Sequence, residues 1–220
     1  MTSRTSISGR WRAWAAAEVM ACLLSITACT GGGTARPGAS PAPESPSFSA
    51  MSTPNATPTP TATSYKPADA SGRAQNVPVP VLPEAAKAET KEGLEAFARY
   101  WFQLLSYGYE TGDTSTLGGI TSSECRACER AKAVMTGWHE DGRWLAGGKT
   151  ETPSISTTFR LAPDGNYQVA IQVSQSALSY FNADGTVHRA DPKPEDTGNL
   201  MLAVFRGGSW YVNNIQPIVG

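Results

Sequence analysis

The sequence predicts an α+β domain in which the helices come first along the chain and antiparallel strands follow. Between residues 90 and 138, apolar side chains recur at steps of three and four, the period of a helix with one buried face. Between residues 155 and 215 they alternate with polar residues, as in strands with one buried face. Helices followed by hairpins favour N-terminal helices packed under an antiparallel sheet of about four strands that wraps over them.

The composition divides the 220 residues into three parts. Eleven of the sixteen prolines fall between Pro37 and Pro83, whereas none of the six tryptophans does. We therefore expect a signal peptide at residues 1–28, a disordered tether rich in Pro, Thr, Ser and Ala at residues 29–83, and a folded domain at residues 84–220. A domain of this size can bury one substantial hydrophobic core.

The leader has the features of a secretory signal. Three arginines and no acidic residue precede its apolar run: Arg4, Arg10 and Arg12. The run from Ala13 to Ala28, interrupted by Glu18, is short for a membrane span, which needs about 20 apolar residues. It ends in the segment Leu24–Cys29, Leu-Ser-Ile-Thr-Ala-Cys, which resembles the lipobox of bacterial lipoproteins.

The lipobox resemblance implies that Cys29 is the first residue of the mature chain and carries lipid, such as palmitate. Cys22 would leave with the leader. Two or three acyl chains on one cysteine hold a protein firmly, whereas a single chain anchors it only marginally. We therefore expect an exported protein, anchored in the cell membrane on its extracytoplasmic face. An ordinary signal peptide and a freely secreted protein are the alternative.

The tether has few apolar side chains to offset the entropy of ordering, so we expect it to stay disordered. Gly31–Gly33 opens it, and Thr57–Thr61 alternates threonine with proline. Near its end, the more apolar segment Val77–Leu82 is expected to lie against the domain as a first extended segment.

The first helix of the domain is expected from about Thr90 to Tyr109. A threonine hydroxyl at this position can accept a hydrogen bond from a backbone N–H of the first turn. The expected buried face consists of Leu94, Phe97, Ala98, Trp101, Leu104 and Leu105. The segment Thr111–Asp113 contains a glycine suited to ending a helix, and residues 114–118 allow one short turn.

A second helix is expected to begin with Ser123 as its cap and to end near Asp141 and Gly142. The side chains predicted to face the core are Cys125, Cys128, Ala131, Val134, Met135 and Trp138. Their spacing follows the helical period.

Four strands are expected after the helices, separated by turns at Asp164-Gly165, at residues 183–186 and at Gly207-Gly208. The first carries Ile155, Thr157 and Phe159, the second Tyr167, Val169, Ile171 and Val173, the third Leu200, Leu202 and Val204, and the fourth Trp210, Val212 and Ile215.

The order of these features resembles the nuclear transport factor two-like, or SnoaL-like, cone fold. The resemblance rests on a first helix with Phe97 and Trp101, a break at Gly112-Asp113 and final strands containing Gly-x-Trp-Tyr-Val at residues 208–212. The lipobox, the tether, Tyr100-Trp101 and the C-x-x-C segment at residues 125–128 together resemble an uncharacterised family of actinobacterial lipoproteins. This resemblance implies location and architecture and supplies no catalytic residues.

Cys125 and Cys128 are the remaining cysteines once Cys22 has left and Cys29 is lipidated. In an exported domain such a pair favours a disulfide, and a spacing of three places both on one side of a helical turn. A thioredoxin-like redox pair is the alternative, although no predicted strand precedes it and its neighbours are not an aromatic residue and a proline. Zinc would need four ligands, so we expect no metal site.

Two histidines and five aromatic residues are the remaining candidates for a site. His139 and His188 could act as general bases, but we expect both to be solvated at the surface. The candidates for lining a pocket are Trp101, Trp138, Trp144, Tyr180 and Trp210. Most aromatic side chains of a small domain belong to its core, which is the competing interpretation.

Charge and motifs exclude several classes of function. The expected mature chain has 15 basic and 18 acidic residues without a basic cluster, which argues against nucleic acid as a partner. No catalytic residue or cofactor follows from the spacing of reactive side chains. We therefore expect a non-enzymatic module that binds a small apolar ligand or an envelope protein. An isomerase- or hydratase-like enzyme with His139 or an acid in its pocket, and a thiol-disulfide protein, are the alternatives.

Overall fold

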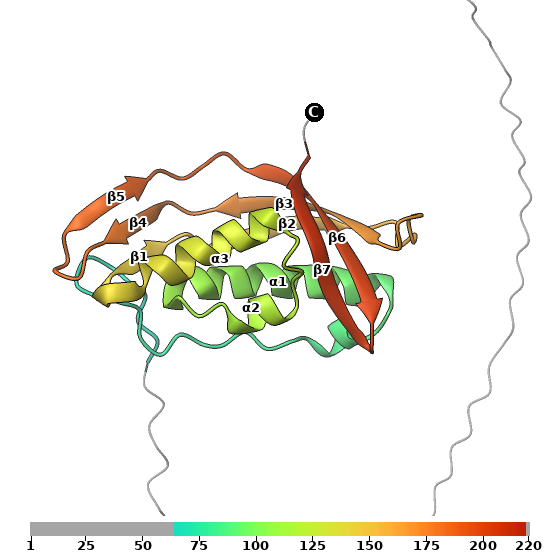
Figure 1. The fold of residues 1–220 in the computed structure, drawn as a ribbon, viewed down its shortest axis with the longest axis horizontal. Coiled ribbons are helices and arrows are strands. Elements are labelled where there is room, and N and C mark those ends of the chain that lie inside the picture. The colour runs from blue at the N-terminus through green and yellow to red at the C-terminus, as the bar shows by residue number, and fades with distance from the viewer. Residues whose placement is uncertain (1–63, 219–220) are drawn as a thin grey trace, which may run out of the picture. The chain divides into compact units, whose positions relative to one another are not determined.

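The computed structural model describes residues 64–218, all of which fall within one compact unit of the chain. The predicted leader, Cys29 and the first part of the tether lie outside the described residues. The fold is α+β, as predicted, with the helices before the strands (Figure 1). No helix in residues 64–218 has the length and apolarity needed to cross a membrane.

Short and long helices precede seven strands along the described residues. The helical elements are η1 (Glu84–Lys87), α1 (Lys91–Thr111), α2 (Ser115–Gly119), α3 (Arg126–Trp138) and η2 (Glu140–Gly142). The strands are β1 (Trp144–Gly147), β2 (Thr150–Ser156), β3 (Tyr167–Gln175), β4 (Leu178–Phe181), β5 (Val187–Asp191), β6 (Thr197–Arg206) and β7 (Ser209–Pro217).

The expectation of a single sheet of about four strands is wrong, because the described residues form two antiparallel sheets. One has the strand order β1-β4-β5 and the other β2-β3-β6-β7. The chain passes from one sheet to the other at Gly147 and Gly148, whose φ angles of 86° and 70° lie in the left-handed region. A Cβ atom added at Gly147 would lie 2.1 Å from the carbonyl oxygen of Ala177, so this crossing requires glycine.

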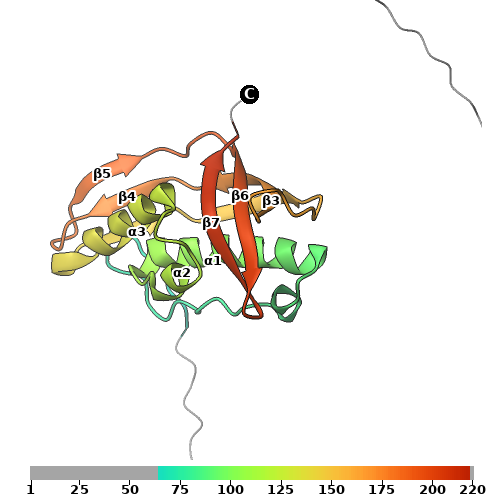
Figure 2. The ribbon, with the colours of Figure 1, turned by 45° about the vertical axis from the view of Figure 1, so that its right-hand side comes forward.

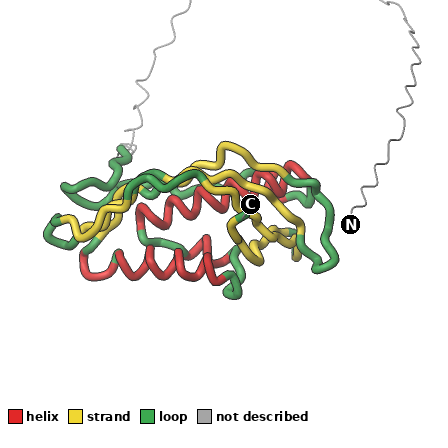
Figure 3. Tube along the Cα trace, turned by 90° about the horizontal axis from the view of Figure 1, so that it is seen from above, coloured by secondary structure: helices red, strands yellow, loops and turns green. Residues whose placement is uncertain are grey.

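Helix α1 forms as predicted, and its two ends have the expected caps. The Thr90 hydroxyl accepts a hydrogen bond from the Gly93 N–H at 3.0 Å. Gly112 ends the helix with a φ of 79°. Helix α1 contacts both sheets, since it touches β1 as well as β2 and β3. Figure 3 shows strands along one side of the two long helices, and further strands that curl round to the other side near the marked C-terminus.

Helix α3 begins later than predicted, because Cys125 and not Ser123 is its N-cap. The Cys125 sulfur accepts a hydrogen bond from the Cys128 N–H at 3.3 Å. The predicted buried face is correct for Cys125, Cys128 and Met135, whereas Val134 is 43% exposed. The helix ends at Trp138, and the short helix η2 continues to Gly142.

Strand β2 ends at Ser156, so the predicted continuation through Thr157 and Phe159 is wrong. Phe159 has a φ of 51°, and its ring stacks on Tyr167 at a centroid distance of 4.8 Å. In β6 the predicted face is also wrong, because the strand buries Met201 and Ala203 fully. The β6–β7 hairpin crosses in front of α1 in Figure 2, and its turn lies at Gly207-Gly208 as predicted.

Residues 64–83, named the N-terminal segment from this point on, contact the folded part of the chain. The sequence places them in the tether and expects contact only from Val77 onward. The Trp144 indole N–H donates to the Asp69 carbonyl at 2.9 Å. The Arg73 guanidinium donates to the carbonyls of His139 at 3.0 Å and Arg143 at 2.7 Å. At its other end, Leu82 packs against the main core.

Candidate functional site

Three of the five predicted pocket residues lie together at the end of the domain formed by α3, β1 and β4. The rings of Trp138 and Tyr180 meet edge to face, with their centroids 5.1 Å apart and an interplanar angle of 88°. The Trp138 indole N–H donates to the Trp144 carbonyl at 3.0 Å. Trp144 is itself stacked on Phe181 at 5.3 Å. The structure thus joins Trp138, Trp144 and Tyr180 into one aromatic cluster.

The other two predicted residues, Trp101 and Trp210, lie in the main hydrophobic core. They are 3% and 2% exposed. The Trp101 indole donates to the Thr121 hydroxyl at 2.8 Å, and that of Trp210 donates to the Ala88 carbonyl at 3.0 Å. Trp210 and Phe97 border a cavity of only about 110 Å³. Trp101 and Trp210 therefore belong to the packed main core.

Beside the aromatic cluster, the surface is hollowed between α3 and the β4–β5 hairpin. This hollow has a volume of about 290 Å³. Its lining consists of Ala133, Val134, Gly137, Trp138, Tyr180, His188 and Arg189. Trp138 and Tyr180 form its aromatic part, and the small side chains of α3 leave room beside them. We name it the aromatic hollow; it has the few polar groups and the apolar lining typical of small-ligand sites.

Two arginines lie over the rings of the aromatic hollow. The guanidinium carbon of Arg189 is 4.0 Å from the ring centroid of Tyr180, and that of Arg143 is 4.7 Å from the ring of Trp138. Both distances are in the range of cation–π contacts. Arg189 also forms an ion pair with Asp191 at 3.0 Å. Burial raises the pKa of Tyr180, so its phenol stays protonated at neutral pH.

The two histidines take different positions at this end. His188 is exposed, as predicted, and its ring lies 4.9 Å from the Trp138 ring. His139 was expected at the surface but is half-buried, with Nδ1 2.8 Å from the Met135 carbonyl oxygen. Its Nε2 is covered and has no hydrogen-bond partner among residues 64–218. Burial lowers the pKa of His139, which favours the neutral ring.

A second depression lies between the N-terminal segment and α1. Its volume is about 420 Å³, and prolines and tyrosines form much of its lining. The Tyr65 hydroxyl donates to the Glu110 carboxylate, and this bond raises the pKa of Tyr65 to about 12. This second depression was not predicted, because it depends on residues that the sequence assigns to the tether.

Cys125 and Cys128 form a disulfide, with their sulfur atoms 2.00 Å apart. Both cysteines are buried, at 0% and 3% exposure. Just before them, the Ser122 N–H donates to the Val212 carbonyl at 2.8 Å, so the bridge lies where α3 meets β7. Within residues 64–218, no three metal-binding side chains are grouped together. Cys29 lies outside the described residues.

The sequence missed Arg189 and Val134 as parts of the aromatic hollow. Both are surface residues whose roles depend on the β4–β5 hairpin, which was not predicted beyond its turn. Arg143 was missed for a similar reason, because it follows η2 and folds back over Trp138. No local sequence signal marks Arg189 or Arg143, and the helical spacing wrongly assigned Val134 to the core.

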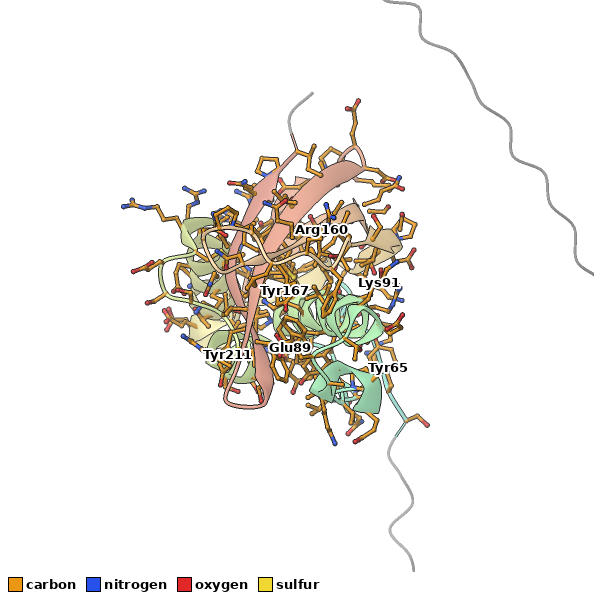
Figure 4. The ribbon with its side chains drawn as sticks, turned by 90° about the vertical axis from the view of Figure 1, so that its right-hand side faces the viewer. Tyr65, Glu89, Lys91, Arg160, Tyr167 and Tyr211 are labelled. Carbon is orange, nitrogen blue, oxygen red and sulfur yellow. A yellow bond between two sulfur atoms is a disulfide. The ribbon has the colours of Figure 1, made fainter. Side chains whose placement is uncertain are left out.

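The loop between β2 and β3 lies at the end of the domain opposite the aromatic hollow (Figure 1). Figure 4 shows Tyr167 beside Glu89 at this end, with Arg160 above them. The Tyr167 hydroxyl donates to the Glu89 carboxylate at 2.9 Å, and this bond raises the pKa of the phenol. The Tyr167 ring also packs edge to face against Trp210, with the centroids 5.3 Å apart.

Comparison with known proteins adds a family without an assigned function. The model of a family described as a family of unknown function, DUF6318, matches residues 63–216. The chain has no match among curated protein sequences. The match to the family starts at the N-terminal segment and includes the disulfide and the aromatic hollow.

Three solved structures show a distant likeness. The intermembrane space region of the chloroplast protein ARC6 gives a TM-score of 0.41 at 8% identity, covering 60% of this chain and 98% of that one. Aln2 from a Streptomyces species gives 0.35 at 12% identity, covering 57% and 88%. A putative calcium/calmodulin dependent protein kinase II association domain from Xanthomonas campestris gives 0.28 at 11%, covering 57% and 84%. Likenesses of this size support no conclusion about this chain.

Proposed function

The chain belongs to the DUF6318 family, a family of unknown function, and from its own residues we propose that it is a lipid-anchored binding protein of the cell envelope. In this proposal Cys29 carries the lipid, and the domain works on the extracytoplasmic face of the membrane. The proposal includes an actinobacterial origin and a cone-like fold related to the nuclear transport factor two-like proteins. The ligand-binding part is the aromatic hollow between α3 and the β4–β5 hairpin.

The single observation that carries the binding role is the hollow itself. Two rings at right angles, Trp138 and Tyr180, and the 43% exposed Val134 line a hollow with a volume of about 290 Å³. Aromatic rings provide large apolar contact areas with few rotatable bonds, so they bind ligands at low entropic cost. The filled core around Trp101 and Trp210 supports binding at this surface over chemistry in an interior pocket.

The disulfide supports the proposed location. Disulfides persist in oxidising compartments outside the cytoplasm and are rare within it. A buried Cys125–Cys128 bridge therefore agrees with an exported domain. The burial of both sulfurs favours a structural bridge over the thiol-disulfide alternative, because a reactive thiol must be reached by its substrate.

His139 gives little support to the enzyme alternative. Nδ1 of its ring is hydrogen-bonded to the Met135 carbonyl, and Nε2 is buried. A general base must come within hydrogen-bonding distance of the proton that it removes. We therefore place the enzyme second to the binding protein.

Labelling cells with a fatty acid tests the anchor. The wild-type chain should carry the label and sediment with membranes, and Cys29→Ala should lose both properties. Ser25→Ala, which keeps the cysteine and the small-residue pattern, is the matched control and should be labelled like the wild type. Equal labelling of wild type and Cys29→Ala would contradict the anchor.

Crosslinking in living cells tests the binding role. A photoreactive phenylalanine derivative at Val134 should give a defined adduct, detected as a mass increase. The same residue at Leu161, an aliphatic position 61% exposed on the loop between β2 and β3, is the control and should give none. Absence of an adduct at both positions, or the same adducts at both, would refute binding at the aromatic hollow.

A further inference from the structure

The residues that line the aromatic hollow include a cation and no anion. Seven residues line it, and Arg189 is the only one with a permanent charge. His188 also lines the hollow, whereas no carboxylate is among the lining residues. A ligand that fills this hollow therefore meets an apolar surface with a cation at one side.

Arg189 is placed to reach a ligand. Its guanidinium lies over the Tyr180 ring at 4.0 Å, and its side chain is 55% exposed. A guanidinium has five N–H donors in a fixed fork that matches a carboxylate or a phosphate. The ring of Tyr180 thus positions these donors next to the apolar lining, where the side chain stays accessible to a ligand.

Asp191 is the competing anion. Its Oδ2 is 3.0 Å from Nη2 of Arg189, and its side chain is 44% exposed. Exposed ion pairs of this kind contribute little to stability, so a bound anion can share or replace Asp191. Asp191 should therefore weaken anion binding without preventing it.

We propose that the aromatic hollow binds a small amphiphile with a flat apolar body and one anionic group, which Arg189 holds. The body lies against Trp138, Tyr180 and Val134, and the anionic group accepts hydrogen bonds from the guanidinium. This inference rests on the proposed binding function and adds the chemical class of the ligand. The class is defined by its chemistry alone, and carboxylates, sulfonates and phosphates all belong to it.

A matched pair of fluorescent probes tests the proposal. Anilinonaphthalene sulfonate and N-phenylnaphthylamine have the same aromatic body, but only the first carries an anionic group. The protein is the expected mature chain, residues 29–220, with Cys29→Ala so that no lipid competes for the probes; it contains both hydrophobic clusters and the disulfide. The sulfonate should bind about tenfold more tightly than the neutral probe, the size of effect that one charge-assisted hydrogen bond gives.

Four variants locate the effect. Arg189→Gln should remove most of the preference for the sulfonate and leave the neutral probe unchanged. Asp191→Asn should strengthen binding of the sulfonate alone. Arg160→Gln, which changes an exposed arginine on the face shown in Figure 4, should change neither affinity. Val134→Glu should weaken both probes, the sulfonate more.

The outcomes separate the two proposals. If both probes bind equally, depend on Val134 and ignore Arg189, the hollow binds ligands without selecting anions, and only this inference fails. If neither probe binds, or neither responds to Val134→Glu, the proposed binding function fails with it.

Discussion

The indole N–H of Trp138 donates to the backbone carbonyl of Trp144 at 3.0 Å, and the Trp144 indole donates in turn to the carbonyl of Asp69 at 2.9 Å. These two bonds connect the aromatic hollow with the N-terminal segment. Arg73 adds a second connection, because it binds the carbonyl of Arg143, whose guanidinium lies over the Trp138 ring. The residues that hold Trp138 are therefore themselves held by the segment nearest the tether.

Trp144→Phe should loosen the N-terminal segment. Phenylalanine keeps an aromatic ring against Phe181 but leaves the Asp69 carbonyl without its donor, at a cost of about 1–2 kcal/mol in the free energy of unfolding. Hydrogen exchange should become faster in residues 64–76. Trp210→Phe, which removes the similar bond to Ala88, is the control: it should lower stability without changing exchange in that segment. The same exchange profile in both variants would contradict this connection.

Removing the disulfide should lower stability by about 2 kcal/mol. The bridge closes a loop of four residues, so it restricts the unfolded chain only modestly. Replacing both Cys125 and Cys128 with alanine, followed by urea unfolding, measures this change. Reduction of the wild type should be slow, because both sulfurs are buried, and intact mass after alkylation follows it. Rapid reduction of the folded protein would instead favour the thiol-disulfide alternative.

Helix α1 could be predicted because its signals are local. A cap at Thr90, a regular apolar face and a glycine at residue 112 all lie within one stretch of the chain. Strand β3 was predicted for the same reason, since its burial alternates from Tyr167 to Val173. By contrast, β4 is buried on both faces and β5 is exposed almost throughout, so neither shows an alternation.

Other features depend on contacts that no local pattern records. Leu200–Phe205 is apolar at every position, so its pattern cannot decide which face of β6 meets the core, and the structure buries Met201 and Ala203. At the start of α3, serine is the usual cap, yet the sulfur of Cys125 takes that role. Which aromatic rings meet also depends on β4, because Trp138 and Tyr180 are far apart in sequence.

The stability of the domain should decrease when the pH falls below about 6.5, the unperturbed pKa of histidine. Burial lowers the pKa of His139, and the positive charge of the nearby Arg73 lowers it further. The hydrogen bond between the His139 ring and the Met135 carbonyl raises this pKa and offsets part of the shift. The folded protein therefore binds this proton less readily than the unfolded chain. The stability that neutral His139 gives the folded protein is fully present above about pH 6.5, and it is lost as the pH falls through the pKa of His139 in the folded state.

Urea unfolding between about pH 7.5 and 5 measures this dependence. His139→Asn keeps a donor for the Met135 carbonyl and removes the titrating ring, so its stability should vary less with pH. His188→Asn changes the exposed histidine and should retain the wild-type profile. An unchanged slope in His139→Asn would show that another group is responsible.

Gly112 and His139 should be energetically coupled. Gly112 has a φ of 79°, and a Cβ added there would lie 2.6 Å from Cγ and 2.7 Å from Cβ of His139. Gly112→Ala thus combines a left-handed backbone with a steric overlap and should lower the free energy of unfolding by about 3 kcal/mol. In His139→Gly, which removes both atoms, the same substitution should cost only the backbone term of about 1–2 kcal/mol. A double-mutant cycle measures the difference, and additive costs would mean that the ends of α1 and α3 separate rather than resist the added methyl group.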